Sequence, residues 1–296
     1  MRVLSLFDGI SIAQLALKEL NIIPEVYYAS EIEKQSILIT QHHFPNTIQL
    51  GDVTKIDFSQ FKDIDLICGG SPCTSFSISG KRTGFDGASG LIKYFFDAID
   101  IIKPKYFFLE NVVMKTDWEY EISKKLGCMP VLINSALVSA QVRKRLYWTN
   151  ISIDFPLDNH HVYLKDILES NVPERYYVKD QNNFVMKEPQ KSNKEKQIRI
   201  GLKHGKNSQG GRLLSIEGKG NTLKTTSMGS DILLIDPETE RKRRLTPLEY
   251  ERLQTIPDNY TAIDGIGHSK RYTTVGNSWT LKVIQHLFKN LSKYNF

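Results

Sequence analysis

The feature that most constrains the fold is an alternation of short apolar runs and helical patterns over residues 2–149. Residues 2–7 form an apolar run, and a turn separates it from residues 12–20, where apolar side chains recur with helical spacing. The same order returns in residues 26–30 and 33–43. Strands that alternate with helices favour an α/β fold with a parallel, buried sheet. We therefore expect a doubly wound, mostly parallel sheet.

The alternation continues along the chain and predicts the remaining elements of this sheet. Further strands are expected at residues 47–50, 65–68, 105–109, 131–138 and 145–149, and further helices at residues 91–102, 116–126 and 279–287. The last of these helices is expected to pack back on the first domain, so that both ends of the chain belong to one fold.

Composition excludes several classes of protein. The chain has 296 residues, of which 40% are hydrophobic and 24% are charged, as expected for a globular protein. It lacks an apolar run of the ~18 residues that span a bilayer, and Asp8 interrupts the apolar N-terminus too early for a signal peptide. Cys68, Cys73 and Cys128 have neither metal-ligand nor disulfide spacing. We expect an intracellular protein without a metal or a membrane partner.

Positive charge is concentrated in one segment. Residues 179–244 contain 15 Lys and Arg against 8 Asp and Glu, a net charge of +7, so the rest of the chain carries −1 of the total of +6. Two interpretations are about equally supported by composition alone: a solvated, lysine-rich surface, or a lobe that binds a polyanion.

Three successive strands end in residues suited to a nucleoside. Gly9 follows the first strand in a turn that leads into a helix, for which Ser11 is a candidate N-cap. Glu31 ends the second strand and is placed to bind a ribose diol, and Asp52 ends the third and could meet an adenine edge. Each acid alone would more often be a helix cap or a solvated turn. The three-glycine dinucleotide fingerprint is absent.

The fourth and fifth strands end in residues suited to catalysis. Gly69 to Cys73 form a turn that Pro72 stiffens, and nearby basic residues favour a thiolate at Cys73, although most cysteines are inert and buried. Glu110 follows an aromatic run, so we expect a half-buried carboxyl with a raised pKa, or else a cap for the helix 116–126. Arg143 and Arg145 suggest contact with an anion, or ordinary surface.

In this set and order, the motifs resemble those of the DNA cytosine-5 methyltransferases. The matching segments run along both ends of the chain in the usual order: Phe7-Asp8-Gly9, Pro72-Cys73, Glu110-Asn111-Val112, Gln141-x-Arg143-x-Arg145, Arg244-Leu245-Thr246-Pro247 with Arg252-Leu253-Gln254, and Gly276-Asn277-Ser278. The amino-acid sequences of these motifs are similar to those of the vertebrate de novo methyltransferases. One departure is that Ala13 stands where the family usually has a second glycine in the first motif.

The resemblance implies a cofactor and a catalytic mechanism. The cofactor would be S-adenosyl-L-methionine, and Cys73 would add to C6 of a flipped-out cytosine so that C5 can take a methyl group. Glu110 would hold a proton at N3, while Arg143 and Arg145 would steady the carbonyl oxygen of the base and the nucleophile loop. The implied cofactor contacts are Phe7, Asp8, Gly9, Ile10, Ser11, Glu31, Ile32, Asp52, Val53, Pro72, Asn277, Ser278 and Trp279.

The resemblance also implies a division into domains and a DNA partner. Residues 1–171 and 241–296 would form the catalytic, cofactor-binding domain, and residues 172–240 the target-recognition region. The glycine-containing loop 74–90 would close over the site as a lid. Candidate contacts with double-stranded DNA are Ser75, Lys81, Arg82, Gln141, Arg212, Lys219 and Lys224.

Several questions stay open at this level. A cognate restriction endonuclease would be a further partner, and the location would be cytoplasmic, at the nucleoid if the source is a bacterium or phage. An amino-methyltransferase would need an Asn/Asp-Pro-Pro-Tyr/Phe motif, which the chain lacks. A transfer-RNA cytosine-5 methyltransferase usually carries a Cys-Phe-Thr signature, which is also missing. A catalytically silent regulatory homologue would usually have lost Cys73, Glu110 or the cofactor residues.

Overall fold

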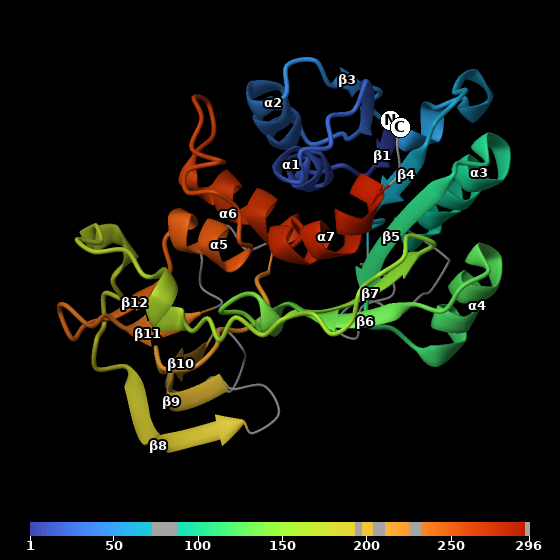
Figure 1. Cartoon of the computed structure of the whole chain (residues 1–296). Coiled ribbons are helices and arrows are strands. Elements are labelled where there is room, and N and C mark those ends of the chain that lie inside the picture. Colours follow the sequence, from blue (N-terminus) through green and yellow to red (C-terminus); the bar gives the residue numbers. More distant parts are fainter. Residues whose placement is uncertain (73–87, 193–196, 204–210, 225–231, 294–296) are drawn as a thin grey trace. The chain divides into compact units, whose positions relative to one another are not determined.

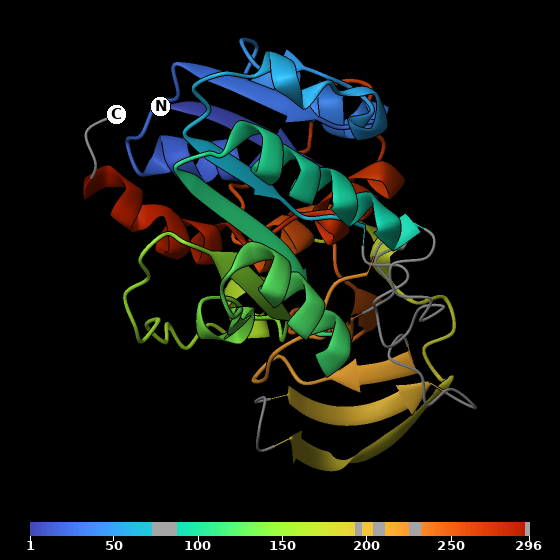
Figure 2. The ribbon, with the colours of Figure 1, turned by 90° about the vertical axis from the view of Figure 1, so that its right-hand side faces the viewer.

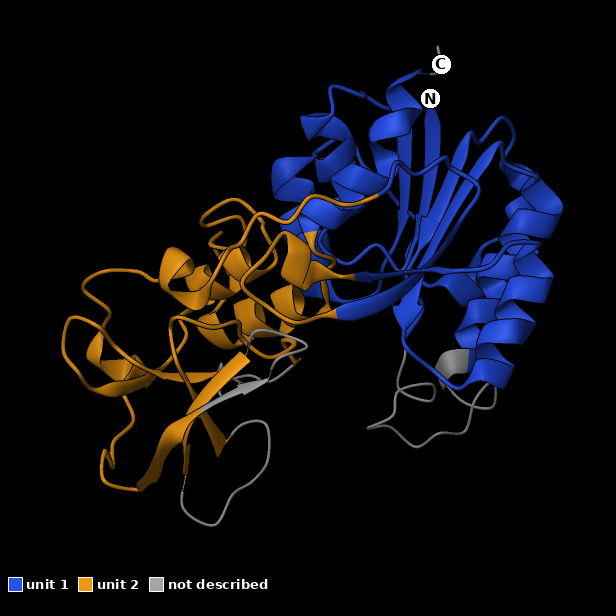
Figure 3. Cartoon of the chain, turned by 60° about the horizontal axis from the view of Figure 1, so that its bottom comes forward, with its two compact units in different colours: residues 1–133, 144–155, 281–296 blue, residues 134–143, 156–280 orange. Residues whose placement is uncertain are grey.

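The computed structural model describes residues 1–72, 88–192, 197–203, 211–224 and 232–293 (Figure 1). The chain divides into two compact units, coloured separately in Figure 3. Unit 1 comprises residues 1–133, 144–155 and 281–296, and unit 2 comprises residues 134–143 and 156–280.

Unit 1 is built on a seven-stranded sheet with the order β3-β2-β1-β4-β5-β7-β6. Its strands are β1 (Arg2–Leu6), β2 (Val26–Ser30), β3 (Ile48–Gln49), β4 (Leu66–Gly69), β5 (Tyr106–Val112), β6 (Val131–Asn134) and β7 (Lys144–Thr149). The neighbours β3, β2, β1, β4 and β5 pair in parallel in this spatial order. β5 pairs with β7 in antiparallel fashion. The expected mostly parallel α/β sheet is therefore confirmed.

Helices lie on both faces of this sheet. They are α1 (Ile12–Glu19), α2 (Lys34–His43), α3 (Ile92–Ile102), α4 (Thr116–Leu126) and α7 (Leu281–Phe288). Figure 2 shows α3 and α4 across one face, where Phe95 and Ile122 join a core with Leu109. On the opposite face, the ring of Phe288 in α7 meets that of Phe108 at a centroid distance of 5.1 Å. The C-terminal helix thus belongs to the same unit as the first strand.

Unit 2 contains a five-stranded sheet with the order β12-β11-β10-β9-β8. Its strands are β8 (Phe184–Ser192), β9 (Gln197–Lys203), β10 (Arg212–Leu214), β11 (Leu233–Ile235) and β12 (Lys242–Arg244), and its helices are α5 (Pro247–Leu253) and α6 (His268–Asn277). Leu234 and Leu245 pack with Tyr250 and Tyr272 in its core. The expected target-recognition region, residues 172–240, lies inside unit 2 and supplies four of these strands.

Two strands end three or more residues from their predicted ends. β5 continues to Val112, so Glu110 lies within the strand and not beyond its end. β6 ends at Asn134 because a 3-10 turn, Ser135–Leu137, follows, and the side chain of Asn134 caps it by accepting from the Ala136 amide at 3.1 Å.

Among the helices of the described residues, none combines the length and apolar character that a bilayer crossing needs. The same residues contain no group of three or more His, Cys, Asp or Glu arranged to hold a metal ion.

Candidate functional site

The turn after β1, residues 7–11, has an unusual backbone. Phe7, Gly9 and Ser11 have φ angles of 59°, 61° and 56°, so every second residue is in the left-handed region. Alternating signs of φ curl a backbone so that amide groups line a concave side that suits an anion or a polar ligand. Nothing lies within 4 Å of the position that a Cβ on Gly9 would occupy, so the turn faces open space. We call residues 7–11 the cofactor turn.

The side chain of Asp8 is buried beneath this turn. Its carboxylate accepts hydrogen bonds from the hydroxyls of Ser11 and Tyr27, the latter at 2.8 Å. Burial raises the pKa of Asp8 from 3.8 to about 6, although these hydrogen bonds act in the opposite direction. Ser11 was predicted to cap α1, but it makes no side-chain hydrogen bond to the helix.

Ala13, where the sequence suggested a missing glycine, is a buried residue of α1. Ser11 is the residue whose φ angle a glycine would adopt without strain.

Glu31, directly after β2, is tied to the cofactor turn. One carboxylate oxygen accepts from the amide of Gly9 at 2.8 Å, and the other accepts from the amides of Ile32 and Glu33 at 2.7 and 2.9 Å. The apolar side chain of Ile32 is 69% exposed. A fixed carboxylate beside an exposed apolar surface is an arrangement that suits the ribose and the flat base of a nucleoside.

Asp52 adopts the alternative that its sequence position left open. It caps a 3-10 turn, Val53–Lys55, by accepting hydrogen bonds from the amide and hydroxyl of Thr54 at 3.0 and 2.9 Å. These bonds lower the pKa of Asp52 below 3.8. Val53 is buried in the core of unit 1. The cap leaves the predicted contact between Asp52 and an adenine untested.

Glu110 in β5 forms an ion pair with Arg145 in β7. The distance from Nε of Arg145 to Oε1 of Glu110 is 2.8 Å, and both side chains are largely buried. The pair forms because β5 and β7 are antiparallel neighbours, with Glu110 opposite Tyr147 and Val112 opposite Arg145. The expectation for Glu110 assumed apolar surroundings; the structure gives it a guanidinium partner.

Asn111 links β5 to the loop that follows β4. Its Nδ2 donates a hydrogen bond to the hydroxyl of Ser71 at 3.2 Å, and both side chains are buried. Pro72 is the last residue described in this loop. Cys73, Ser75, Lys81 and Arg82, with most of the expected lid, lie outside the described residues.

Gln141 and Arg143 belong to unit 2, whereas Arg145 belongs to unit 1. Gln141 is completely buried and donates to the carbonyl oxygen of Leu253 and the side chain of Gln254, both at 2.7 Å. Arg143 is also buried and donates to the carbonyl oxygen of Ser278 at 3.0 Å. Gln141 therefore takes part in the internal hydrogen-bond network of unit 2, and its contact with DNA stays a prediction.

The C-terminal cofactor candidates surround the end of α6. Asn277 is exposed, and Ser278 and Trp279 are buried. The carbonyl oxygen of Ser278 also accepts from Gln254 at 2.9 Å, so this segment is held by the same network as Gln141.

The three DNA-contact candidates of the basic segment lie in different surroundings. Lys224 is exposed, Arg212 is half-buried, and Lys219 is 2% exposed. The ammonium of Lys219 donates to the carbonyl oxygens of Ser139 and Val162 at 2.8 and 2.5 Å. Lys219 therefore acts as an internal hydrogen-bond donor in this structure and does not present its charge to a phosphate.

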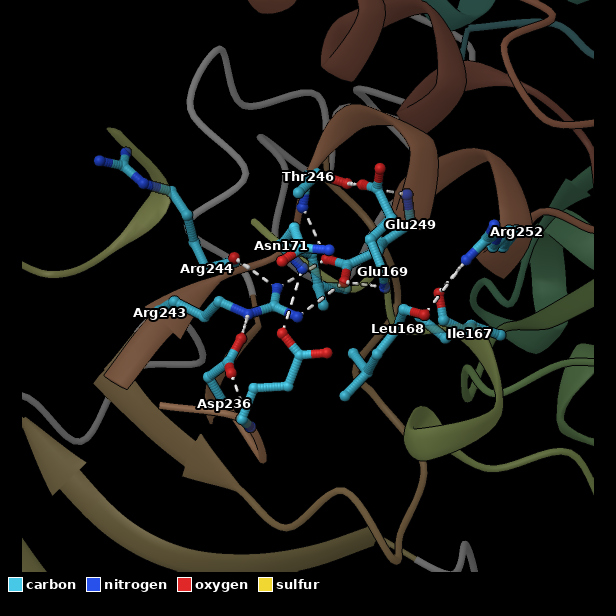
Figure 4. Close-up of polar contacts among 12 residues, drawn as sticks. Ile167, Leu168, Glu169, Asn171, Asp236, Arg243, Arg244, Thr246, Glu249 and Arg252 are labelled. Atoms are coloured by element: carbon cyan, nitrogen blue, oxygen red, sulfur yellow. Dashed lines mark hydrogen bonds and ion pairs between the residues drawn. The ribbon is translucent and has the colours of Figure 1, made fainter. Parts of the chain in front are cut away.

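Sequence reasoning missed a buried charge cluster next to the motif Arg244-Leu245-Thr246-Pro247 (Figure 4). Arg243 is fully buried and pairs with Asp236 at 2.5 Å and with Glu249 at 2.8 Å. Glu249 also accepts from the amides of Thr246 and Glu169 at 2.8 and 3.0 Å. In the sequence, Arg243 stands among three other basic residues and counts toward the positive charge of the segment 179–244. The pattern Thr246-x-x-Glu249, typical of a capping box, is the signal that indicates the buried carboxylate.

The mostly parallel α/β sheet, with a glycine turn after β1 and a carboxylate directly after β2, defines a class of fold that suits a nucleoside ligand. A family model described as C-5 cytosine-specific DNA methylase matches residues 1–293. The chain therefore belongs to the C-5 cytosine-specific DNA methylase family, and its activity class is cytosine C5 methylation. This confirms the family suggested by the sequence motifs.

Curated relatives agree with this assignment. The chain is 28% identical over 324 residues to the type II methyltransferase M.HhaI of Haemophilus parahaemolyticus, covering 100% of this chain and 96% of that protein. It is 30% identical to M1.ScrFI of Lactococcus lactis subsp. cremoris, covering 98% of this chain and 77% of that protein.

Solved structures show the same fold. The Entamoeba histolytica methyltransferase EhMeth superposes with a TM-score of 0.74 at 17% identity, covering 99% of this chain and 98% of that one. The S. pombe Dnmt2 methyltransferase gives a TM-score of 0.72 at 17% identity and covers 100% of both chains. At these identities the likeness supports the fold alone.

Proposed function

We propose that this protein transfers a methyl group from S-adenosylmethionine to C5 of a flipped-out cytosine in double-stranded DNA, through a covalent adduct between Cys73 and C6. The observation that carries this proposal is the link between β4 and β5. These strands are parallel neighbours with Gly69 opposite Leu109, and Asn111 donates to Ser71. Glu110, the proposed acid, therefore lies at the same end of the sheet as the start of the loop that leads to Cys73.

The described residues fit the cofactor. The cofactor turn faces open space at Gly9, Glu31 offers a fixed carboxylate, and Ile32 offers an exposed apolar surface. We propose that Phe7 to Ser11 hold the amino-acid portion, that Glu31 and Ile32 hold the ribose and the base, and that Asp52, Val53, Pro72 and Asn277 to Trp279 complete the site. When bound, S-adenosylmethionine supplies the electrophilic methyl group.

The chain's own residues prepare the cytosine. The thiolate of Cys73 forms a bond to C6, and the electron pair of the C5–C6 double bond becomes available at C5. Glu110 holds a proton at N3, which stabilises the negative charge that addition would otherwise leave on the ring. After C5 has gained the methyl group, a base removes the C5 proton, the double bond re-forms, and the C6–sulfur bond breaks to regenerate the thiolate.

The two arginines have different proposed parts. Arg145 holds the carboxylate of Glu110 in place, as its ion pair indicates. Arg143 is proposed to steady the carbonyl oxygen of the base. Exposed basic residues of the segment 172–240, Lys224 among them, would contact phosphates. The type II names of M.HhaI and M1.ScrFI support a restriction-modification role. We propose a cognate endonuclease as partner and a cytoplasmic location.

The test is transfer of tritiated methyl groups from S-adenosylmethionine to unmethylated DNA, with total RNA in a parallel reaction. We expect 5-methylcytosine in DNA only. Cys73→Ala should abolish transfer and retain DNA binding, whereas Cys128→Ala, which alters a half-buried thiol elsewhere in unit 1, should leave transfer unchanged.

Each other outcome contradicts a different part of the proposal. Incorporation only into RNA would make the protein a transfer-RNA type of cytosine methyltransferase. Normal turnover by Cys73→Ala would exclude the covalent mechanism. Absence of transfer to either nucleic acid would favour a regulatory homologue.

A further inference from the structure

Beneath the cofactor turn, a chain of hydroxyl groups converges on one carboxylate. Both oxygens of Asp8 are used: Oδ1 accepts from Tyr27 at 2.8 Å, and Oδ2 accepts from Ser11. The hydroxyl of Thr40, in α2, donates in turn to the Ser11 oxygen at 3.2 Å. Ser11 and Thr40 are 0% exposed and Tyr27 is 3% exposed, so solvent does not supply alternative partners.

This network competes with the usual behaviour of a serine at a helix start. An N-cap serine normally has an extended backbone, and its oxygen accepts a hydrogen bond from the second or third amide of the helix. Ser11 occupies the N-cap position of α1 but has φ 56° and ψ 43°, and it makes no side-chain cap. Its hydroxyl is directed to Asp8 instead.

The two arrangements have different consequences for the turn. In the observed one, the left-handed Ser11 completes the alternation begun by Phe7 and Gly9, and the serine does not occupy the first amides of α1. In the ordinary capping arrangement, Ser11 would return to the extended region and its oxygen would occupy those amides. The cofactor turn would then lose the last of its three left-handed residues.

We propose that Asp8 and Tyr27 are positioning residues for cofactor binding, which hold Ser11 in the left-handed conformation and keep its hydroxyl away from the first turn of α1. This inference rests on the proposed function, since it takes the cofactor turn as the place where S-adenosylmethionine binds. Neither side chain needs to touch the cofactor. Tyr27 acts through Asp8, and Asp8 acts through Ser11.

The first experiment compares two tyrosines of the same strand. Tyr27→Phe removes the hydrogen bond to Asp8, and we expect the Kd for S-adenosylmethionine, measured by calorimetry without nucleic acid, to rise about tenfold, the usual effect of one buried hydrogen bond to a charged group. Tyr28→Phe is the matched control, because Tyr28 is the next residue of β2 and its hydroxyl accepts a 3.4 Å hydrogen bond from Arg2 and not from a residue of the cofactor turn. Its Kd should equal that of the wild type.

The second experiment repeats Tyr27→Phe in a Ser11→Gly background. Glycine adopts the left-handed region without strain and carries no hydroxyl to be held. We therefore expect Tyr27→Phe to have no further effect on the Kd there, which is a coupling that a loss of general stability would not produce.

Three results would count against these ideas, and they are distinguishable. Equal Kd values for Tyr27→Phe and Tyr28→Phe would overturn the positioning role. So would a Tyr27→Phe effect of the same size in both backgrounds. A wild-type chain that binds no S-adenosylmethionine would instead overturn the proposed cofactor site itself.

Discussion

At the scale of single residues, Asp8 is a buried acid whose carboxylate accepts hydrogen bonds from the hydroxyls of Ser11 and Tyr27. Burial raises the pKa of Tyr27, so its hydroxyl stays protonated and donates. Hydroxyl donors offset only part of the free energy needed to remove a carboxylate from water. The ionised form of Asp8 should therefore reduce the stability of unit 1.

The pH dependence of Asp8→Asn tests this. The folded state raises the pKa of Asp8 from 3.8 to about 6, so the stabilisation from the protonated form is complete below pH 3.8 and is lost as the pH rises through 6. Between pH 5 and 7.5, the unfolding free energy of the wild type should fall by about 1 kcal/mol relative to that of Asp8→Asn. Urea unfolding of both variants at the two pH values measures this difference. A constant difference would show that Asp8 does not titrate in this range.

At the scale of secondary-structure elements, an arginine within β12 is buried, whereas the arginine just before this strand is partly exposed. Arg243 in β12 is sealed between Asp236 and Glu249, whereas Arg241 forms a partly exposed pair with Glu174. Burial acts to raise the pKa of Asp236, but the Arg243 guanidinium outweighs it and the pKa lies below 3.8. Removing one member of a buried cluster leaves the opposite charges uncompensated.

Arg243→Met should therefore lower the free energy of unfolding by about 3–5 kcal/mol. The same change at Arg241 should have little effect, because exposed ion pairs are screened by water. Urea titrations followed by tryptophan fluorescence measure both. Equal stability of the two variants would mean that the Arg243 cluster is energetically unimportant, and a more stable Arg243→Met would mean that the apolar side chain packs better than the charges did.

The same elements show what the sequence could and could not predict. Long buried strands such as β5, and helices with a clear apolar face such as α3, were predicted to within a few residues, because burial on a parallel sheet leaves a continuous apolar signal. The sheet of unit 2 was not predicted. Its strands β10, β11 and β12 have three residues each, which is too short for a periodic pattern.

In the candidate site, residue types were easier to predict than their partners. Glu31 and Glu110 were identified from their places at the ends of apolar runs, but their bonds to the Gly9 amide and to Arg145 depend on pairing between strands. Gln141 is a DNA-contact candidate because of the family motif that contains it, and Lys219 because of its place in the basic segment. Their burial results from carbonyl oxygens supplied by distant segments, which no local pattern reveals.

At the scale of the whole molecule, the basic segment is less positive toward solvent than its composition suggests. Arg243 and Lys219 are buried, and Arg241 is paired with Glu174. Exposed lysines of the segment, such as Lys224, remain as candidates for contact with the proposed DNA. Composition left two interpretations of this segment open, a solvated surface and a polyanion-binding lobe. Either one involves fewer exposed positive charges than the number of Lys and Arg residues in the segment.

Salt dependence discriminates between them. If the segment contacts phosphates, the Kd for duplex DNA should rise about tenfold or more between 50 and 200 mM salt, because bound counterions are released. Lys224→Gln should reduce the slope of log Kd against log salt by about 1. Lys289→Gln, which removes a charge paired with Asp154 in unit 1, is the control and should leave the slope unchanged. A flat dependence for the wild type would exclude phosphate contact by this segment.

The position of α7 has a consequence for the order of events during synthesis. Its residues Leu281–Phe288 complete unit 1, where Phe288 packs on Phe108 and Gln285 donates to Glu19 of α1. At a translation rate of about 5–20 residues per second, α7 leaves the ribosome roughly tens of seconds after α1. Until then, the apolar surface of α1 and β5 has no cover from this helix. The nascent chain therefore exposes this apolar surface through most of its synthesis. A chaperone that binds it would protect the N-terminal half of the protein from aggregation more than the C-terminal half.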